Sequence, residues 1–206
     1  MLSQKLLKRA QSNNPIRVGI VGAGKFGSGL AVQISRMKGM KVCAIADFIS
    51  DRARAAYTAS GFPKSAVRSV RNKQDLDDAI HSGNQSITED GLLLATSDLL
   101  EVLVECTGIP EVGARIAYTA ITHNTHVVMV NVEADVTVGP ILKHQADRAG
   151  LVYTLVDGDQ PGVIMNLVEW ARCLGFELVA AGRGTIFYKS DREGTPDTVP
   201  NRFGFT

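Results

Sequence analysis

Residues 16–34 read "IRVGIVGAGKFGSGLAVQI", and this stretch sets the fold class. It begins with an apolar run, carries five glycines and continues with apolar residues at helical spacing. Gly22, Gly24 and Gly27 match the pattern G-x-G-x-x-G, which binds dinucleotides when it follows a buried strand and opens a helix. The apolar run predicts the strand and residues 25–37 predict the helix, so both conditions are met.

Each glycine of the pattern has a predicted task at a phosphate. Gly22 permits the tight turn, Gly24 lets the backbone approach a pyrophosphate, and Gly27 lets the helix pack closely on the strand. The start of the following helix offers unpaired N–H groups and a partial positive charge. Lys25 and Phe26, the two residues between Gly24 and Gly27, complete the predicted phosphate-binding segment.

Asp47 ends the next predicted strand, 41–47, at the spacing from Gly27 that a ribose-binding carboxylate takes. A carboxylate repels a 2′-phosphate and favours NAD(H). Arg52 and Arg54 follow closely and can pair with a 2′-phosphate, so the predicted cofactor is NADP(H) or NAD(H). The alternative is a glycine turn that serves packing alone, with Asp47 as a cap and the arginines on a solvated helix face.

The composition is that of a globular protein, with 206 residues of which 45% are hydrophobic. A formal net charge of +1 gives no general attraction to nucleic acid, and no apolar run reaches the length of a membrane span. Cys43, Cys106 and Cys173 show no C-x-x-C spacing, which favours reduced cysteines in or near the core of a cytoplasmic protein. We therefore expect no nucleic-acid or membrane partner.

Strand-like and helix-like runs alternate along the chain. The predicted strands are 16–21, 41–47, 100–108, 126–132, 151–156 and 176–184, and the main predicted helices are 25–37, 50–60, 110–124, 139–150 and 161–175. The polar segment 64–97 contains two short predicted helices, 74–83 and 91–96, and no strand that can be assigned. This alternation predicts an α/β protein with a Rossmann-type doubly wound parallel sheet.

Three regions are predicted. Residues 1–15 form an N-terminal amphipathic extension, 16–160 an NAD(P)-binding Rossmann domain, and 161–206 the beginning of an α+β substrate or catalytic domain. The regular pattern stops after Gly184, so we expect this last domain to be incomplete.

Ligands of open parallel sheets bind outside the carboxyl ends of the strands, where several polar residues are expected. Glu105, Thr107 and Gly108 end one predicted strand and are expected to line the nicotinamide ribose. Asn131, after the next strand, is a further predicted cofactor contact.

Three acids at predicted strand ends, Glu133, Asp157 and Asp159, are candidates for proton transfer or for binding a divalent metal. Lys189 is a further catalytic candidate, and the residues predicted to hold the substrate are Gln160, Arg183 and Lys189. The alternative is that the acids cap helices and the cations are solvated. No histidine spacing suggests zinc, and no residue is assigned as a metal ligand.

The segment "LVECTG" with the following "PEVGARIAYTAITHNTHVVMVN" resembles the nucleotide-binding half of the homoserine dehydrogenase family. The run "VEADVTVGPILKHQADRAGLVYTLVDGDQPG" is similar to a branch of deoxyxylulose-phosphate-reductoisomerase-like oxidoreductases, some with a C-terminal SAF domain. Members are longer than this chain. The resemblance implies rearrangement of 1-deoxyxylulose 5-phosphate and reduction by NADPH, a step of isoprenoid precursor synthesis.

Homoserine dehydrogenases carry a catalytic lysine at the position where this chain has Val132. Homoserine dehydrogenase activity is therefore the alternative, and an NAD(P)-binding module without turnover is a third reading. We expect a small-molecule substrate and a homo-oligomer.

Overall fold

The computed structural model describes residues 1–156, 160–182, 192–195 and 197–198, without the side chains of Gln160 and Pro161. The chain divides into two compact units, Met1–Val156 and Asp157–Thr206. The first holds the sheet and the second holds helix α8, Gln160–Cys173.

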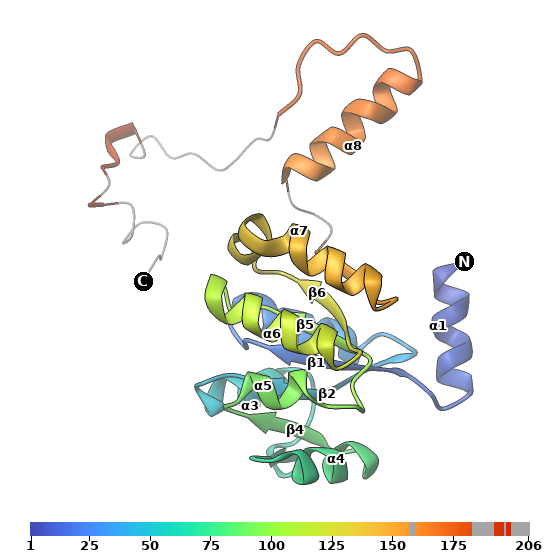
Figure 1. Cartoon of the computed structure of the whole chain (residues 1–206), viewed down its shortest axis with the longest axis vertical. Helices are drawn as coiled ribbons and strands as arrows, with labels where there is room; N and C mark the ends of the chain where they lie inside the picture. The colour runs from blue at the N-terminus through green and yellow to red at the C-terminus, as the bar shows by residue number, and fades with distance from the viewer. Residues whose placement is uncertain (157–159, 183–191, 196, 199–206) are drawn as a thin grey trace. The chain divides into compact units, whose positions relative to one another are not determined.

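The first unit is built on a seven-stranded parallel sheet with the order β3-β4-β2-β1-β5-β6-β7 (Figure 1). Every strand pair is parallel, as the alternating pattern predicts, and the expected Rossmann-type doubly wound fold is confirmed. The strands are β1 Ile16–Val21, β2 Met40–Ala46, β3 Val67–Ser69, β4 Gln85–Thr88, β5 Val102–Glu105, β6 His126–Met129 and β7 Tyr153–Leu155.

Helices cover both faces of this sheet and enclose two hydrophobic clusters. On one face lie α4 Lys73–His81, α5 Gly91–Ala95, α6 Pro110–Thr122 and α7 Val132–Arg148; on the other lie α2 Lys25–Ser35 and α3 Ser50–Ala59. Consecutive residues of β5 serve opposite clusters, since Leu103 packs with the first set of helices and Val104 with the second. Both faces of the sheet are therefore covered by helices, and a ligand site is expected at the carboxyl ends of the strands.

A short helix, α1 Leu2–Gln11, precedes the sheet. Arg9 of α1 pairs with Glu101 at 2.5 Å, and the backbone of Leu6 packs against Gly39. These contacts hold α1 at the amino ends of the strands, away from the glycine turn.

Among the described residues, no helix has the length and apolarity that crossing a membrane requires.

Three predictions about elements were wrong. Strands β3 and β4 form within the polar segment 64–97, because backbone pairing in the sheet does not require an apolar sequence. Helix α7 begins at Val132, seven residues before the predicted start, and runs through Pro140. The predicted strand 176–184 is not formed over residues 176–182, and its last two residues lie outside the described part.

Candidate cofactor-binding site

Gly22 is required by the geometry of the turn that leaves β1. Its φ of +96° is strained for any residue with a side chain, and an added Cβ would lie 2.7 Å from the backbone of Cys106. The glycine turn therefore lies in close contact with the backbone of the segment that follows β5.

Gly27 and Gly24 serve different purposes. A Cβ on Gly27 would collide with the carbonyl oxygen of Gly22, so Gly27 is needed for close packing of α2 on the turn. Gly24 has an ordinary φ of −69° and would meet no protein atom within 4 Å. Nothing in the chain's own packing requires Gly24 to be glycine, and the space beside it is open to a ligand.

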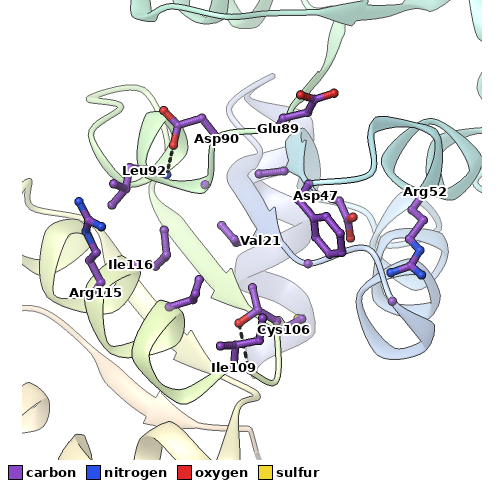
Figure 2. Close-up of a pocket in the computed structure, with 17 residues that line it drawn as sticks. Val21, Asp47, Arg52, Glu89, Asp90, Leu92, Cys106, Ile109, Arg115 and Ile116 are labelled. Atoms are coloured by element: carbon purple, nitrogen blue, oxygen red, sulfur yellow. Dashed lines mark hydrogen bonds between the residues drawn. The ribbon is translucent and has the colours of Figure 1, made fainter. Parts of the chain in front are cut away.

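A pocket of about 430 Å³ opens beside this turn (Figure 2). It lies where the carboxyl ends of β1, β2, β4 and β5 meet, and α5 and α6 supply another wall. Its lining residues are Val21, Gly22, Gly24, Ala46, Asp47, Phe48, Arg52, Glu89, Asp90, Gly91, Leu92, Cys106, Thr107, Ile109, Val112, Arg115 and Ile116. Most of the lining residues are apolar and a few are charged, as in small-molecule sites.

Asp47 is only 8% exposed and connects the two turns on its side of the pocket. Its Oδ2 accepts the Ala23 N–H at 2.7 Å, and its Oδ1 accepts the Ile49 N–H at 2.9 Å. A carboxylate has about four acceptor positions, so roughly two stay free for ligand hydroxyl groups. Asp47 thus shapes the glycine turn and still faces the pocket.

The two arginines after Asp47 point to different places. The Arg52 guanidinium, labelled in Figure 2, lies 5.8 Å from the centre of the Phe48 ring, and both residues line the pocket. Arg54 instead donates to the carbonyl of Val67 at 3.2 Å and to the Ser69 hydroxyl at 3.0 Å. Of these two arginines, only Arg52 is therefore placed to contact a ligand in the pocket.

The pocket contains three charged residues that sequence reasoning missed, Glu89, Asp90 and Arg115. Asp90 caps α5 by accepting the Leu92 N–H at 2.9 Å, and Glu89 accepts the Ser50 hydroxyl at 2.5 Å. Both follow β4, the strand that the sequence did not reveal. Recognising that strand would have placed "TEDG" at the carboxyl edge of the sheet.

The loop after β5 places Thr107 on the pocket wall, while Gly108 adopts a φ of +70°. Glu105 does not line the ribose site as expected, because its side chain turns inward and is fully buried. Burial raises the pKa of Glu105, and polar contacts with Thr107 and Asn131 oppose this effect only in part. Burial and the nearby Glu105 also raise the pKa of Cys106 to about 12, which keeps its thiol neutral.

Several predicted residues lie away from this pocket. Lys25 and Phe26 line a separate shallow groove on α2. Asn131 is buried and caps α7, accepting the Ala134 N–H at 3.1 Å. Glu133 lies exposed in the first turn of α7 rather than at a strand end.

The remaining candidates cannot be placed with the pocket. Asp157, Asp159, Arg183 and Lys189 lie outside the described residues, as does the side chain of Gln160, the first residue of α8. Within the described ranges, no three histidine, cysteine, aspartate or glutamate side chains gather closely enough to hold a metal ion.

The residues of the pocket suit a dinucleotide. An uncapped α2 N-terminus faces the space beside Gly24, where a phosphate would find N–H donors. Asp47 offers acceptors for ribose hydroxyls, and the apolar walls suit a base. Arg52 and Arg115 add cations on opposite sides (Figure 2).

Comparison with solved structures supports the fold. The WlbA dehydrogenase from Bordetella pertussis in complex with NADH and UDP-GlcNAcA is 20% identical with a TM-score of 0.56, and the match covers 78% of this chain and 42% of that one. An NAD binding oxidoreductase from Klebsiella pneumoniae is 17% identical with a TM-score of 0.53, over 78% of this chain and 39% of that one. The chain therefore spans about two fifths of the length of these relatives.

Comparison with protein families is more specific. A search of curated protein sequences returned no match. Residues 158–204 match the family described as "Oxidoreductase DRL, catalytic domain". Residues 22–153, more than half of the chain, match the family described as "Homoserine dehydrogenase, NAD binding domain". The glycine turn, Asp47 and the β5 loop all fall within this longer match, and the chain belongs to the homoserine dehydrogenase NAD-binding domain family.

Proposed function

We propose that this chain carries the cofactor-binding part of an NAD(P)-dependent oxidoreductase and that the pocket beside the glycine turn holds the dinucleotide. The observation that carries this proposal is Gly24, a glycine at the mouth of the pocket that neither its φ nor its neighbours require. Family membership supports the same reading. Residues 16–160 would form the cofactor domain and 161–206 part of a substrate domain.

Each wall of the pocket has a proposed task. The N-terminus of α2 would bind the pyrophosphate, and Asp47 would accept hydrogen bonds from the adenosine ribose. Thr107 and its loop would meet the nicotinamide half. When bound, the nicotinamide would supply or accept a hydride, while the chain's own residues orient it.

We propose NAD(H) as the first cofactor to test, because Asp47 places a buried negative charge next to the ribose site. Arg52 is the argument for NADP(H), since its guanidinium lines the same pocket. No described acid forms an ion pair with Arg52, which leaves it available to a 2′-phosphate.

For the substrate, we propose 1-deoxyxylulose 5-phosphate, converted by a reductoisomerase reaction of isoprenoid precursor synthesis. The match of residues 158–204 to a DRL catalytic domain supports this choice. Homoserine is the second candidate because of the family description. Against it stands Val132, the first residue of α7, at the position where the resemblance expects a catalytic lysine. A valine side chain cannot transfer a proton.

The test is a titration of the chain with NADH and NADPH by fluorescence, followed by assays of cofactor oxidation. Deoxyxylulose phosphate and homoserine are compared as substrates at equal cofactor occupancy. Turnover with deoxyxylulose phosphate supports the full proposal, and turnover with homoserine alone replaces the substrate. Binding without turnover leaves a cofactor-binding module. Absence of binding to both dinucleotides refutes the assignment of the pocket.

We further propose a homo-oligomer that acts in the cytoplasm. A divalent metal cofactor, without assigned ligands, is part of the same proposal. Light scattering during size-exclusion chromatography measures the subunit number. Adding Mg²⁺ or a chelator to the turnover assay tests the metal.

A further inference from the structure

Glu105 is a buried carboxylate for which dinucleotide binding assigns no direct role. Its side chain is fully buried at the end of β5. Oε1 accepts the Thr107 N–H at 2.8 Å, whereas Oε2 receives no hydrogen bond of regular geometry from the described residues. No described cation pairs with it. A carboxylate in this environment is costly, so a compensating task is expected.

Asn131 holds the other end of the same loop. Its Nδ2 donates to the Ile109 carbonyl at 3.0 Å, while its Oδ1 caps α7. Within the loop, the Ile109 N–H also reaches the Thr107 hydroxyl at 3.3 Å. The backbone from 107 to 109 is therefore attached at both ends to buried side chains, Glu105 at the end of β5 and Asn131 at the start of α7.

Gly113 of α6 makes room for both side chains. A Cβ on Gly113 would lie 2.7 Å from Asn131 Nδ2 and 2.8 Å from Glu105 Oε2. Glycine in a helix interior costs about 1 kcal/mol relative to alanine. The space for Glu105 and Asn131 explains why this helix carries a glycine.

We infer that Glu105 and Asn131 form a buried brace that positions the 106–109 loop against the nicotinamide half of the cofactor. Cys106, Thr107 and Ile109 of this loop line the pocket. In a doubly wound sheet, the strands around β1 and β2 hold the adenosine half and the second half-sheet faces the other nucleotide. The inference rests on the proposed function. Glu105 and Asn131 are positioning residues, since both are buried behind the loop.

This role predicts a selective loss. Disturbing the brace should weaken NADH binding, since a displaced loop meets the nicotinamide side poorly. Binding of ADP, which contains only the adenosine half, should be retained. A purely structural role would weaken both ligands together.

The experiment uses two glycine substitutions in helices. Gly113→Ala pushes a methyl group into the brace, whereas Gly29→Ala in α2 adds the same group where no protein atom lies within 4 Å. Calorimetric titration of each variant with NADH and with ADP should show about tenfold weaker NADH binding for Gly113→Ala and ADP binding within about twofold of the parent. Gly29→Ala should match the parent for both ligands.

Asn131→Ser is the second variant, in case Gly113→Ala folds poorly. Serine keeps a helix cap for α7 but removes the amide that reaches Ile109. The same NADH-selective loss supports the brace. Unchanged NADH binding in both variants overturns it, as does an equal loss of NADH and ADP. If the parent chain binds ADP but not NADH, both the brace and the proposed function are overturned. If the parent chain binds NADH and both variants bind it equally well, only the brace is overturned.

Discussion

Two glutamates four residues apart lie at opposite ends of β5 in opposite surroundings. Glu101, before the strand, is 28% exposed in its side chain and pairs with Arg9 at 2.5 Å and Arg17 at 3.6 Å. Glu105, at the end of the strand, is fully buried and pairs with no described cation. The glutamate at the amino edge of the sheet is thus paired with two cations, whereas the glutamate at the carboxyl edge accepts one backbone N–H, from Thr107.

The difference separates stability from function. At the amino edge, Glu101 also accepts the Arg17 N–H at 3.0 Å, so its contacts attach α1 to the sheet, and Glu101 is not among the residues that line the pocket. At the carboxyl edge, Asp47 and Glu105 accept N–H groups from the loops that surround the pocket. Substitutions at the first edge should change unfolding, and substitutions at the second should change ligand binding.

The largest expected effect is at Gly24. Gly24→Val should weaken NADH binding by at least about a hundredfold, because a side chain would occupy the space of the pyrophosphate. The melting temperature should stay within about 2 °C of the parent, since no protein atom lies within 4 Å of the added Cβ. Gly29→Val is the control on the same helix and should bind normally. Parent-like NADH binding by Gly24→Val would show that the pocket is not the cofactor site.

The next effect concerns the choice of cofactor. Asp47→Ala should weaken NADH binding by about tenfold and NADPH binding less, because the ribose contact is lost while repulsion of a 2′-phosphate is relieved. Both affinities are measured by fluorescence titration. Asp51→Ala removes an exposed carboxylate in the first turn of α3 and should leave the NADH-to-NADPH ratio unchanged. An equal loss of both cofactors with Asp47→Ala would contradict the ribose assignment.

At the amino edge, Glu101→Gln should lower the free energy of unfolding by about 1 kcal/mol, since partly exposed ion pairs contribute little more than this. NADH affinity should not change. Urea unfolding combined with NADH titration measures both quantities. Arg9→Gln should give a similar loss, and the double variant should lose less than the sum because the two residues share one interaction. Weakened NADH binding in Glu101→Gln would contradict the view that the amino edge of the sheet serves stability and the carboxyl edge serves ligand binding.

The smallest effect is the pH dependence at Glu105. Its pKa is raised above the ordinary value of 4.5, so the folded state holds the proton more tightly than the unfolded state. Stability should therefore fall as the pH rises from that value through the folded pKa. Glu105→Gln removes this titration, and its stability relative to the parent should increase with pH. Urea unfolding over a pH series measures the difference, and a difference that is constant with pH would exclude a buried titrating Glu105.

The glycine turn could be predicted because its signal is local. Gly22, Gly24 and Gly27 lie within six residues, between a buried strand and a helix, so the motif and its context are read together. Asp47 could be predicted for the same reason, as it ends the next strand. Its placement at the pocket agrees with that reading, although its two backbone hydrogen bonds were not foreseen.

The opposite wall of the pocket could not be predicted. Strand β4 contains the buried polar residues Gln85, Ser86 and Thr88, so it shows no apolar periodicity. Without that strand, Glu89 and Asp90 lie in an unassigned polar segment. The burial of Glu105 could not be predicted either. Alternate residues of β5 face the same side of the sheet, so the Glu105 side chain lies on the face of Leu103, next to Gly113 of α6.

The order of apolar and glycine residues along the chain determined the alternating elements, the parallel sheet and the phosphate-binding turn, because each depends on neighbours a few residues away. Only the tertiary structure decided which strand ends meet. The β2–β4 and β1–β5 pairs bring together residues far apart in sequence, so the pocket walls and the Glu105–Asn131 brace exist only once the sheet is assembled. Side-chain partners across strands depend on strand order and register, which no local pattern specifies.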